Sequence, residues 1–183
     1  AEWCCDPERI AIMGFSAGGH LAAHYSNYYN CPQVREVFPE SKKVNASILC
    51  YPVITADPAF SHKGSFENLL GAYPGEHDAF SCNKMVSEAT PPTFLWHTAA
   101  DALVSVNNSL LYAQALAAQK VSFELHVYPY GAHGRSTAET ALNVGCVSAF
   151  RKTWNDQSVI VLMNIAPDAA QADLSAYTDV NDV

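Results

Sequence analysis

A serine stands between two glycines near the start of the sequence, in the run Gly14-Phe15-Ser16-Ala17-Gly18. This run matches G-x-S-x-G, the pattern in which a serine nucleophile occupies a sharp turn between a strand and a helix. Small residues at both flanks would avoid clashes in such a turn, so Gly14 and Gly18 are expected to be required. The N–H of Ala17, at a helix start, could donate to an oxyanion. The alternative is a glycine-rich turn in which Ser16 only caps the helix.

A serine nucleophile needs a base, and the base needs an acid that orients it. For this kind of turn the acid follows the serine along the chain, and the histidine follows the acid. Asp101 lies three residues after the apolar run 93–98, and His133 lies in a glycine-flanked loop after the run 122–128. We therefore predict Ser16 as nucleophile, Asp101 as orienting acid and His133 as base. The alternative for Asp101 alone is a helix N-cap.

Other histidines and the cysteines give weaker signals. His20 and His24 are four residues apart, a spacing that fits two metal ligands on one helix face. No third ligand is apparent and HExxH is absent, so we expect no metal and no cofactor. His97 ends a predicted strand and is expected to support the Asp101 loop. The six cysteines include no C-x-x-C pair, which argues against a zinc site.

The elements that must position these residues follow from the hydrophobic pattern. Short apolar runs predict strands at 9–15, 46–54, 93–98 and 122–128, and helical patterns cover 20–29, 106–119 and 136–154. Strands that alternate with helices indicate an α/β fold with a mostly parallel sheet flanked by helices. Beyond residue 154, the segment 159–165 is expected to be a further strand or helix, followed by a polar acidic tail.

Composition narrows the function classes. A chain of 183 residues with 49% hydrophobic and 15% charged residues is neither disordered nor collagen-like. The net charge of −8 argues against nucleic acid, although five of the acids lie between 153 and 183 and say little about the substrate. No apolar run approaches the roughly 20 residues of a membrane helix, so no membrane partner is expected. No leader pattern opens the sequence, and we expect a cytoplasmic location.

The motifs together resemble the bacterial α/β-hydrolase acetylesterases related to xylan and carbohydrate esterases. The resemblance covers roughly residues 7–135 and rests on 9–23, 51–54, 95–104, 108–110 and 123–134. It implies Ser16, Asp101 and His133 as the triad of a serine esterase that removes short acyl groups, typically acetyl, from sugars or small esters. The implied partner is a small-molecule ester. A peptidase or thioesterase of the same fold is the alternative enzyme.

The sequence departs from this family upstream of the serine. Family members carry strands and a His-Gly-Gly oxyanion loop there, whereas only fifteen residues precede Ser16. We therefore expect a partial α/β-hydrolase fold that lacks the N-terminal strands, with 1–154 as the C-terminal part of the catalytic domain and 155–183 as an acidic extension. Missing strands would leave an open edge, so the chain is expected to be weakly active or unstable unless an oligomer or other partner covers it. The non-enzyme alternative is a truncated domain that is inactive or only binds a partner.

Overall fold

The computed structural model describes residues 6, 8–71, 77–129, 131–134, 138–141, 147–154 and 157–164. The chain forms two compact units, Ala1–Gly134 and Arg135–Val183, which are described separately. All predicted site residues lie in the first unit. The catalytic-domain boundary predicted at residue 154 stays a prediction.

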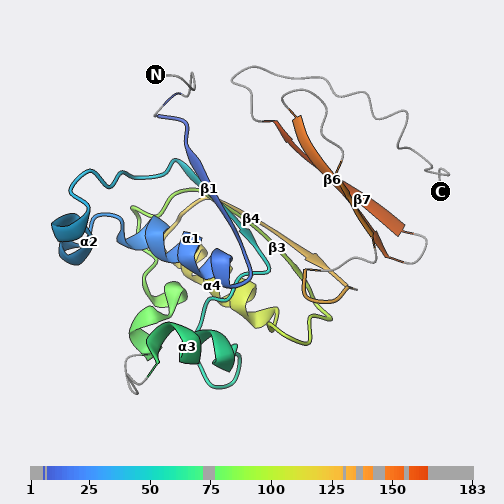
Figure 1. Ribbon diagram of the computed structural model, residues 1–183, viewed down its shortest axis with the longest axis horizontal. Coiled ribbons are helices and arrows are strands. Elements are labelled where there is room, and N and C mark those ends of the chain that lie inside the picture. Colours follow the sequence, from blue (N-terminus) through green and yellow to red (C-terminus); the bar gives the residue numbers. More distant parts are fainter. Residues whose placement is uncertain are drawn as a thin grey trace. The chain divides into compact units, whose positions relative to one another are not determined.

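The first unit is built on a four-stranded parallel sheet in the order β1-β2-β3-β4 (Figure 1). Among its described residues, β1 and β4 are the edge strands. The predicted α/β class and the parallel sheet are confirmed. The strands are β1 (Ala11–Phe15), β2 (Ala46–Cys50), β3 (Thr93–Thr98) and β4 (Phe123–Tyr128), and the helices are α1 (Ala17–Tyr28), α2 (Pro32–Val37), α3 (Lys63–Leu70) and α4 (Asn107–Ala118), with two 3₁₀ turns at His77–Phe80 and Cys82–Lys84.

Strand β2 is shorter than the run 46–54 that the sequence predicts for it. It ends at Cys50, because the next two residues cannot continue a regular strand. Tyr51 has a positive φ of 39°, and Pro52 has no N–H for the ladder. The chain therefore leaves the sheet beside the end of β1, where Ser16 lies.

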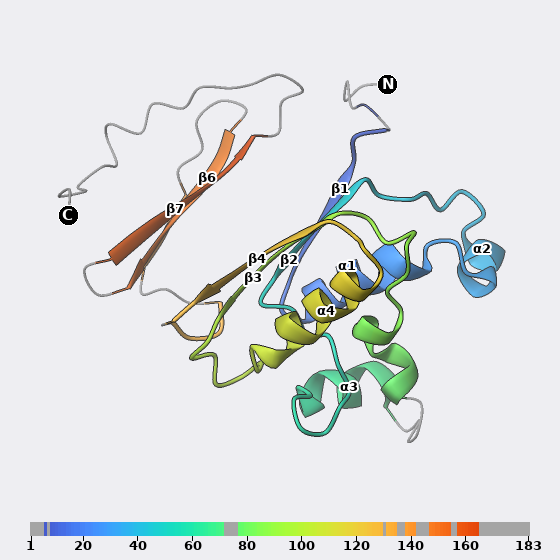
Figure 2. The same cartoon turned by 180° about the vertical axis from the view of Figure 1, so that it is seen from behind.

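Helices α1 and α4 lie on the same side of the sheet, as the two opposite views show (Figures 1 and 2). The main core fills the space between them and the sheet. Leu49 and Leu95 contribute from the strands, and the small Ala23 of α1 and the large Tyr112 and Leu116 of α4 complete the layer. All five are fully buried, and the small side chain on α1 lets that helix approach the strands closely.

The segment after β2 is fixed to the start of α4 by one buried amide. The Asn108 side chain is 0% exposed. Its Oδ1 accepts from the N–H groups of Ile54 and Thr55 at 2.8 and 3.0 Å, and its Nδ2 donates to the carbonyls of Phe60 and Ser105, both at 2.9 Å. All four hydrogen-bonding positions are satisfied, so this segment is held beside the Asp101 loop.

The second unit is a three-stranded antiparallel sheet in the order β5-β6-β7. Its strands are β5 (Ala138–Ala141), β6 (Val147–Trp154) and β7 (Gln157–Asn164). The helix predicted over 136–154 is wrong. Gly145 weakens a helix in its middle, and β6 pairs instead with the β-branched run 159–161 of β7. The segment 159–165 is thus a strand up to Asn164, and the predicted acidic tail lies outside the described residues.

Candidate active site

The serine of the G-x-S-x-G run occupies a strained turn. Ser16 lies between β1 and α1 with φ 54° and ψ −122°, a conformation that is costly for a residue with a side chain. Its N–H donates to the carbonyl of Cys50 at 3.0 Å, and its carbonyl accepts from the N–H groups of His20 and Val53 at 3.2 and 3.0 Å. Three backbone hydrogen bonds therefore hold the strained residue in place.

The predicted requirement for glycine at two positions is confirmed at Gly14 alone. A Cβ on Gly14 would lie 2.2 Å from the carbonyl oxygen of Gly18, so no side chain fits there. The prediction that Gly18 avoids a clash is wrong, because a Cβ on Gly18 would meet nothing within 4 Å. Gly19 is the second constrained position, since its Cβ would lie 2.7 Å from the Cβ of Pro52. The chain after β2, rather than the turn itself, imposes this second constraint.

The three residues predicted as nucleophile, base and acid lie in one hydrogen-bonded row. Nε2 of His133 is 2.7 Å from Oγ of Ser16, and Nδ1 of His133 is 2.7 Å from Oδ2 of Asp101. An ionised carboxylate only accepts, so Nδ1 carries the proton toward Asp101 and Nε2 is left to accept from the serine hydroxyl. This tautomer is the one that a general base requires.

The capping alternatives fail for both Ser16 and Asp101. Ser16 is at the N-cap of α1 but makes no side-chain cap hydrogen bond. The N-cap residue of α4 is Val106, well beyond Asp101. Oδ1 of Asp101 instead accepts from the N–H groups of Leu103 and Val104, both at 2.9 Å. The carboxylate is therefore fixed by its own loop while Oδ2 faces His133.

These contacts keep Asp101 charged. Burial alone would raise the pKa of Asp101, but hydrogen bonds from the Val104 amide, the His133 side chain and the Leu103 amide outweigh it. The net effect places the pKa of Asp101 below its ordinary value. The acid is thus a carboxylate at neutral pH and can stabilise a protonated His133.

His97 lies beneath the Asp101 loop. Its Nε2 is 2.9 Å from the carbonyl of Val104 and 3.3 Å from Oδ2 of Asp101, and its Nδ1 is 2.8 Å from Oγ of Ser109. The carbonyl requires a proton on Nε2, so Nδ1 accepts from the serine hydroxyl. Burial lowers the pKa of His97, which keeps the ring neutral. These are the contacts expected of a residue that supports the loop.

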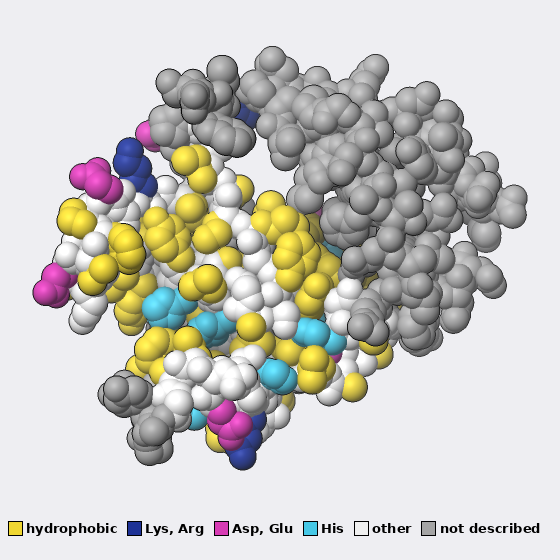
Figure 3. Space-filling model, viewed as in Figure 1, with side chains coloured by type: hydrophobic (Ala, Val, Ile, Leu, Met, Phe, Trp, Pro, Cys, Tyr) yellow, Lys and Arg dark blue, Asp and Glu magenta, His cyan; other side chains and the backbone are white. Residues whose placement is uncertain are grey.

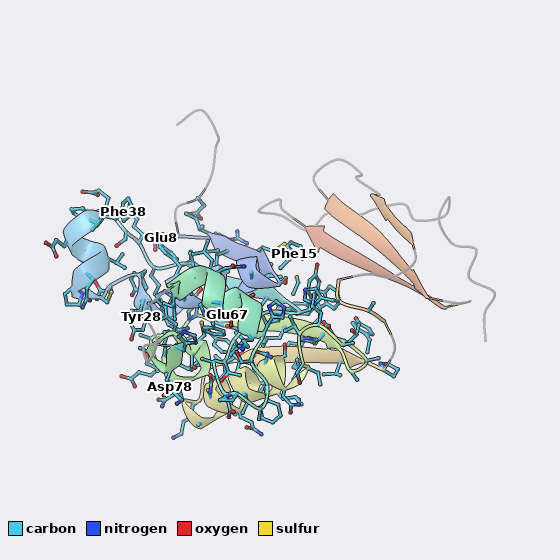
Figure 4. The ribbon with its side chains drawn as sticks, turned by 60° about the horizontal axis from the view of Figure 1, so that its bottom comes forward. Glu8, Phe15, Tyr28, Phe38, Glu67 and Asp78 are labelled. Carbon is cyan, nitrogen blue, oxygen red and sulfur yellow. The ribbon has the colours of Figure 1, made fainter. Side chains whose placement is uncertain are left out.

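A small pocket opens beside the predicted oxyanion donor. Ala17 is exposed at the start of α1. The pocket has a volume of about 70 Å³, which is room for only a few heavy atoms. Helix α3, on which Figure 4 marks Glu67, supplies half of its wall. The lining residues are Ala17, His20, Val53, Ser65, Phe66 and Leu69.

The two histidines with the spacing of a metal pair are engaged in other contacts. Nε2 of His20 is 2.9 Å from the carbonyl of Phe80, and the His24 ring stacks on the Phe80 ring with centroids 5.5 Å apart. Figure 3 shows histidines among hydrophobic side chains on the face of the molecule that it draws. Within the described ranges, no three His, Cys, Asp or Glu side chains are grouped to hold a metal ion.

The sequence pattern assigns no individual role to Tyr51, Asn108 or Ser109. In the structure the Tyr51 ring contacts that of His133, with centroids 4.8 Å apart. The one local signal is a Tyr-Pro pair directly after an apolar run.

The described part of the chain contains no helix of the length and apolarity needed to cross a bilayer.

Residues 1–116 match the model of a protein family described as BD-FAE. The chain is 40% identical over 145 residues to endo-1,4-beta-xylanase B of Butyrivibrio fibrisolvens, which covers 75% of this chain and 22% of that protein. It is 36% identical over 138 residues to an acetylxylan esterase of Xylanibacter ruminicola, covering 72% and 27%. The predicted resemblance to xylan and carbohydrate esterases is confirmed.

Solved structures show the same relationship. The chain resembles an acetyl ester-xyloside bifunctional hydrolase from Caldicellulosiruptor lactoaceticus, with 45% identity, a TM-score of 0.61, and coverage of 70% of this chain and 49% of that one. It also resembles the carboxylesterase Cest-2923 from Lactobacillus plantarum, with 29% identity, a TM-score of 0.53, and coverage of 70% and 47%. The chain therefore spans about half the length of these solved chains and about a quarter of the curated relatives.

Proposed function

The chain belongs to the BD-FAE family and has part of the α/β-hydrolase fold, and from this we propose that it is a serine esterase acting on short-chain, acetyl-type esters of carbohydrates. The observation that carries the proposal is the row from Ser16 through His133 to Asp101, in which both hydrogen bonds measure 2.7 Å. The relatives named acetylxylan esterase and acetyl ester-xyloside hydrolase support the substrate class.

In the first half of the proposed reaction, Oγ of Ser16 attacks the carbonyl carbon of the ester while its proton passes to Nε2 of His133. The carboxylate of Asp101 stabilises the imidazolium through Nδ1–H. The backbone N–H of Ala17 donates to the oxyanion of the tetrahedral intermediate. His133 then protonates the departing alcohol oxygen, the carbon–oxygen bond breaks, and the acyl group remains as an ester on Ser16.

In the second half, a water molecule attacks this acyl-enzyme. His133 takes a proton from the water, and the backbone N–H of Ala17 again donates to the oxyanion. The bond to Ser16 then breaks, the serine oxygen recovers its proton from His133, and the carboxylic acid leaves. The low pKa of Asp101 suits both halves, because the carboxylate must stay ionised whenever the imidazole is protonated.

The pocket beside Ala17 supports a short acyl group. Its volume of about 70 Å³ suits an acetyl group, and the fully buried Phe66 ring forms part of its wall. Because the wall is mostly apolar, with Val53 and Leu69 beside that ring, the methyl end of an acyl chain fits it better than a charged group does.

The proposed partner is a small-molecule ester, with no cofactor. Two further parts of the proposal come from the sequence, namely a cytoplasmic location and an oligomer that covers an open edge of the sheet. The edge position of β1 among the described strands supports the second part.

The direct test is hydrolysis of p-nitrophenyl acetate and release of acetate from acetylated xylo-oligosaccharides. The wild-type chain is expected to act on both, and Ser16→Ala to lose at least about a thousandfold in kcat. Ser41→Ala is the matched control, because the Ser41 hydroxyl bonds the Tyr29 carbonyl outside the site. Equal activity in the wild type and Ser16→Ala would exclude Ser16 as nucleophile. If the wild type releases acetate from neither the xylo-oligosaccharides nor the p-nitrophenyl ester, the proposed esterase activity is wrong.

A further inference from the structure

Tyr51 has a backbone conformation that its side chain disfavours. Its φ is 39°, in the region that few non-glycine residues and very few bulky ones adopt. The N–H of Tyr51 donates to the carbonyl of Trp96 at 2.7 Å, which ties the strained residue to β3. Strain of this kind persists only where the surroundings enforce it, and it is concentrated at functional sites.

The Tyr51 ring is packed between two other rings. The His133 imidazole meets it edge-on, with centroids 4.8 Å apart and planes at 77°. The Trp96 indole meets it at 4.9 Å and 73°. Such edge-to-face contacts fix the tilt of both partners. The His133 imidazole therefore packs against the Tyr51 ring, which in turn packs against the buried Trp96 side chain of β3.

The loop that carries His133 is formed with two glycines. Gly131 and Gly134, on either side of His133, both have positive φ values, 129° and 63°. A Cβ on Gly134 would lie 2.6 Å from the hydroxyl oxygen of Tyr51 and 2.7 Å from its ring carbon Cζ. The phenol thus occupies the space that a side chain at 134 would need, and the loop is shaped around it.

From these contacts we infer that Tyr51 is a positioning residue for His133, whose ring holds the imidazole in line between Ser16 and Asp101. The inference rests on the proposed function, since it assigns a task to the same row. Tyr51 acts through His133 and touches no reacting atom in this role. A loss of the ring lets the imidazole tilt, and a misplacement of about 1 Å can cost about a hundredfold in rate.

The test compares Tyr51→Leu with Tyr51→Phe. Tyr51→Leu is expected to lower kcat for p-nitrophenyl acetate by about ten- to a hundredfold while KM changes less than about twofold. Tyr51→Phe keeps the ring and is expected to stay within about threefold of the wild-type kcat. Tyr25→Leu, which removes a tyrosine bonded to the Lys42 carbonyl, is the control and keeps its activity. A rise in KM with unchanged kcat in Tyr51→Leu, or a loss in Tyr51→Phe equal to that in Tyr51→Leu, would overturn the inference.

A second readout does not depend on turnover. The Nδ1–H proton of His133, bonded to Asp101 at 2.7 Å, is expected at low field in the proton NMR spectrum of the wild type and of Tyr51→Phe. Tyr51→Leu is expected to lose or shift that signal while its far-ultraviolet circular dichroism stays native. If the wild type hydrolyses no ester but the signal behaves in this way, the proposed function fails and the positioning role stands. If the signal is the same in all three proteins, the positioning role is wrong.

Discussion

At the scale of single residues, the candidate site depends on which atom carries each proton. Asp101 is held by two amide N–H groups on Oδ1, so its other oxygen is free to fix the Nδ1–H tautomer of His133. The basic Nε2 then points at Ser16. A change that reverses this tautomer should therefore abolish the base without moving a single backbone atom.

Asp101→Asn makes that change. The amide oxygen can still accept from Leu103 and Val104, which leaves its NH₂ facing His133 and forces the proton onto Nε2. We expect kcat for p-nitrophenyl acetate to fall by about 10⁴-fold with little change in unfolding temperature. Asp57→Asn is the control, since Asp57 is exposed and its carboxylate accepts from the Ala59 N–H at 2.9 Å. A kcat within tenfold of the wild type would show that Asp101 does not orient His133.

His20 gives a prediction about stability and pH. Burial lowers the pKa of His20 below 6.5, although the Phe80 carbonyl opposes the shift. The unfolded chain therefore binds a proton near pH 6.5 that the folded chain does not bind. The free energy of unfolding is therefore highest above about pH 6.5. It falls as the pH drops below that value, by at most about 1.4 kcal/mol per pH unit. Urea unfolding between pH 7.5 and 5.5 should show a smaller fall for His20→Gln, whose amide can keep the bond to Phe80. Identical slopes in the two proteins would contradict this.

Much of the site could be predicted from the sequence, because its signals are local. The G-x-S-x-G run and the order of Asp101 and His133 after two apolar runs were enough to select the three side chains that meet. The roles of Tyr51 and Ser109 were not predictable, because no motif in the sequence links Tyr51 to His133 or Ser109 to His97. The second glycine requirement was placed at Gly18 rather than at Gly19, because it comes from Pro52, which lies far along the sequence and faces Gly19.

At the scale of elements, the connection from β1 to α1 controls where Ser16 lies. The backbone of Gly18 and Gly19 passes so close to Gly14 that a Cβ there would lie 2.2 Å from an oxygen and 2.8 Å from a nitrogen. The first turn of α1 is thus packed against the end of β1, and the strained φ of Ser16 follows from this packing.

Gly14→Ala and Gly18→Ala form a matched pair that tests this packing. Gly14→Ala must move backbone and is expected to lower the free energy of unfolding by about 2–3 kcal/mol. Gly18→Ala adds a methyl group in open space on a helix, and is expected to be neutral or to stabilise by up to about 1 kcal/mol. Urea titration of both variants measures the difference. Equal destabilisation by the two alanines would mean that the turn is not packed as described.

Helix α3 is expected to set the acyl length. Leu69 is 52% exposed and lies on the pocket wall, so Leu69→Ala opens the pocket with little effect on stability. The ratio of kcat/KM for p-nitrophenyl butyrate to that for acetate is expected to rise about tenfold. Leu21→Ala, on α1 and 70% exposed, should leave the ratio unchanged. An unaltered ratio in Leu69→Ala would show that the acyl chain does not enter this pocket.

The four strands of the first unit and its helices α1 and α4 were predictable because strand and helix periods alternate clearly between residues 9 and 128. The predicted strand 93–98 agrees with β3 at both ends. The predicted helix 136–154 failed because its helical pattern is outweighed over its second half by the pairing of β6 with the run 157–164 of β7. Pairing between separate segments overrides weak local preference in this way.

At the scale of the whole molecule, the first unit holds the complete Ser16–His133–Asp101 row, while the chain spans about half the length of its solved relatives. Among the described strands of that unit, β1 and β4 are at the edges, and Phe15 and Val127 on them are exposed. The expectations of missing N-terminal strands, of weak activity in the isolated chain and of an oligomer that covers the edge all stay predictions.

The most direct measurement labels the intact chain with a fluorophosphonate and locates the adduct by mass spectrometry after digestion. This reagent phosphonylates an activated serine even where turnover is slow. Among all the serines of the chain, we predict a single adduct on Ser16, absent from Ser16→Ala and strongly reduced in His133→Gln, because an unactivated hydroxyl reacts poorly. An unlabelled Ser16 in the folded wild-type chain, or labelling of another serine in its place, would contradict the assignment of a serine esterase.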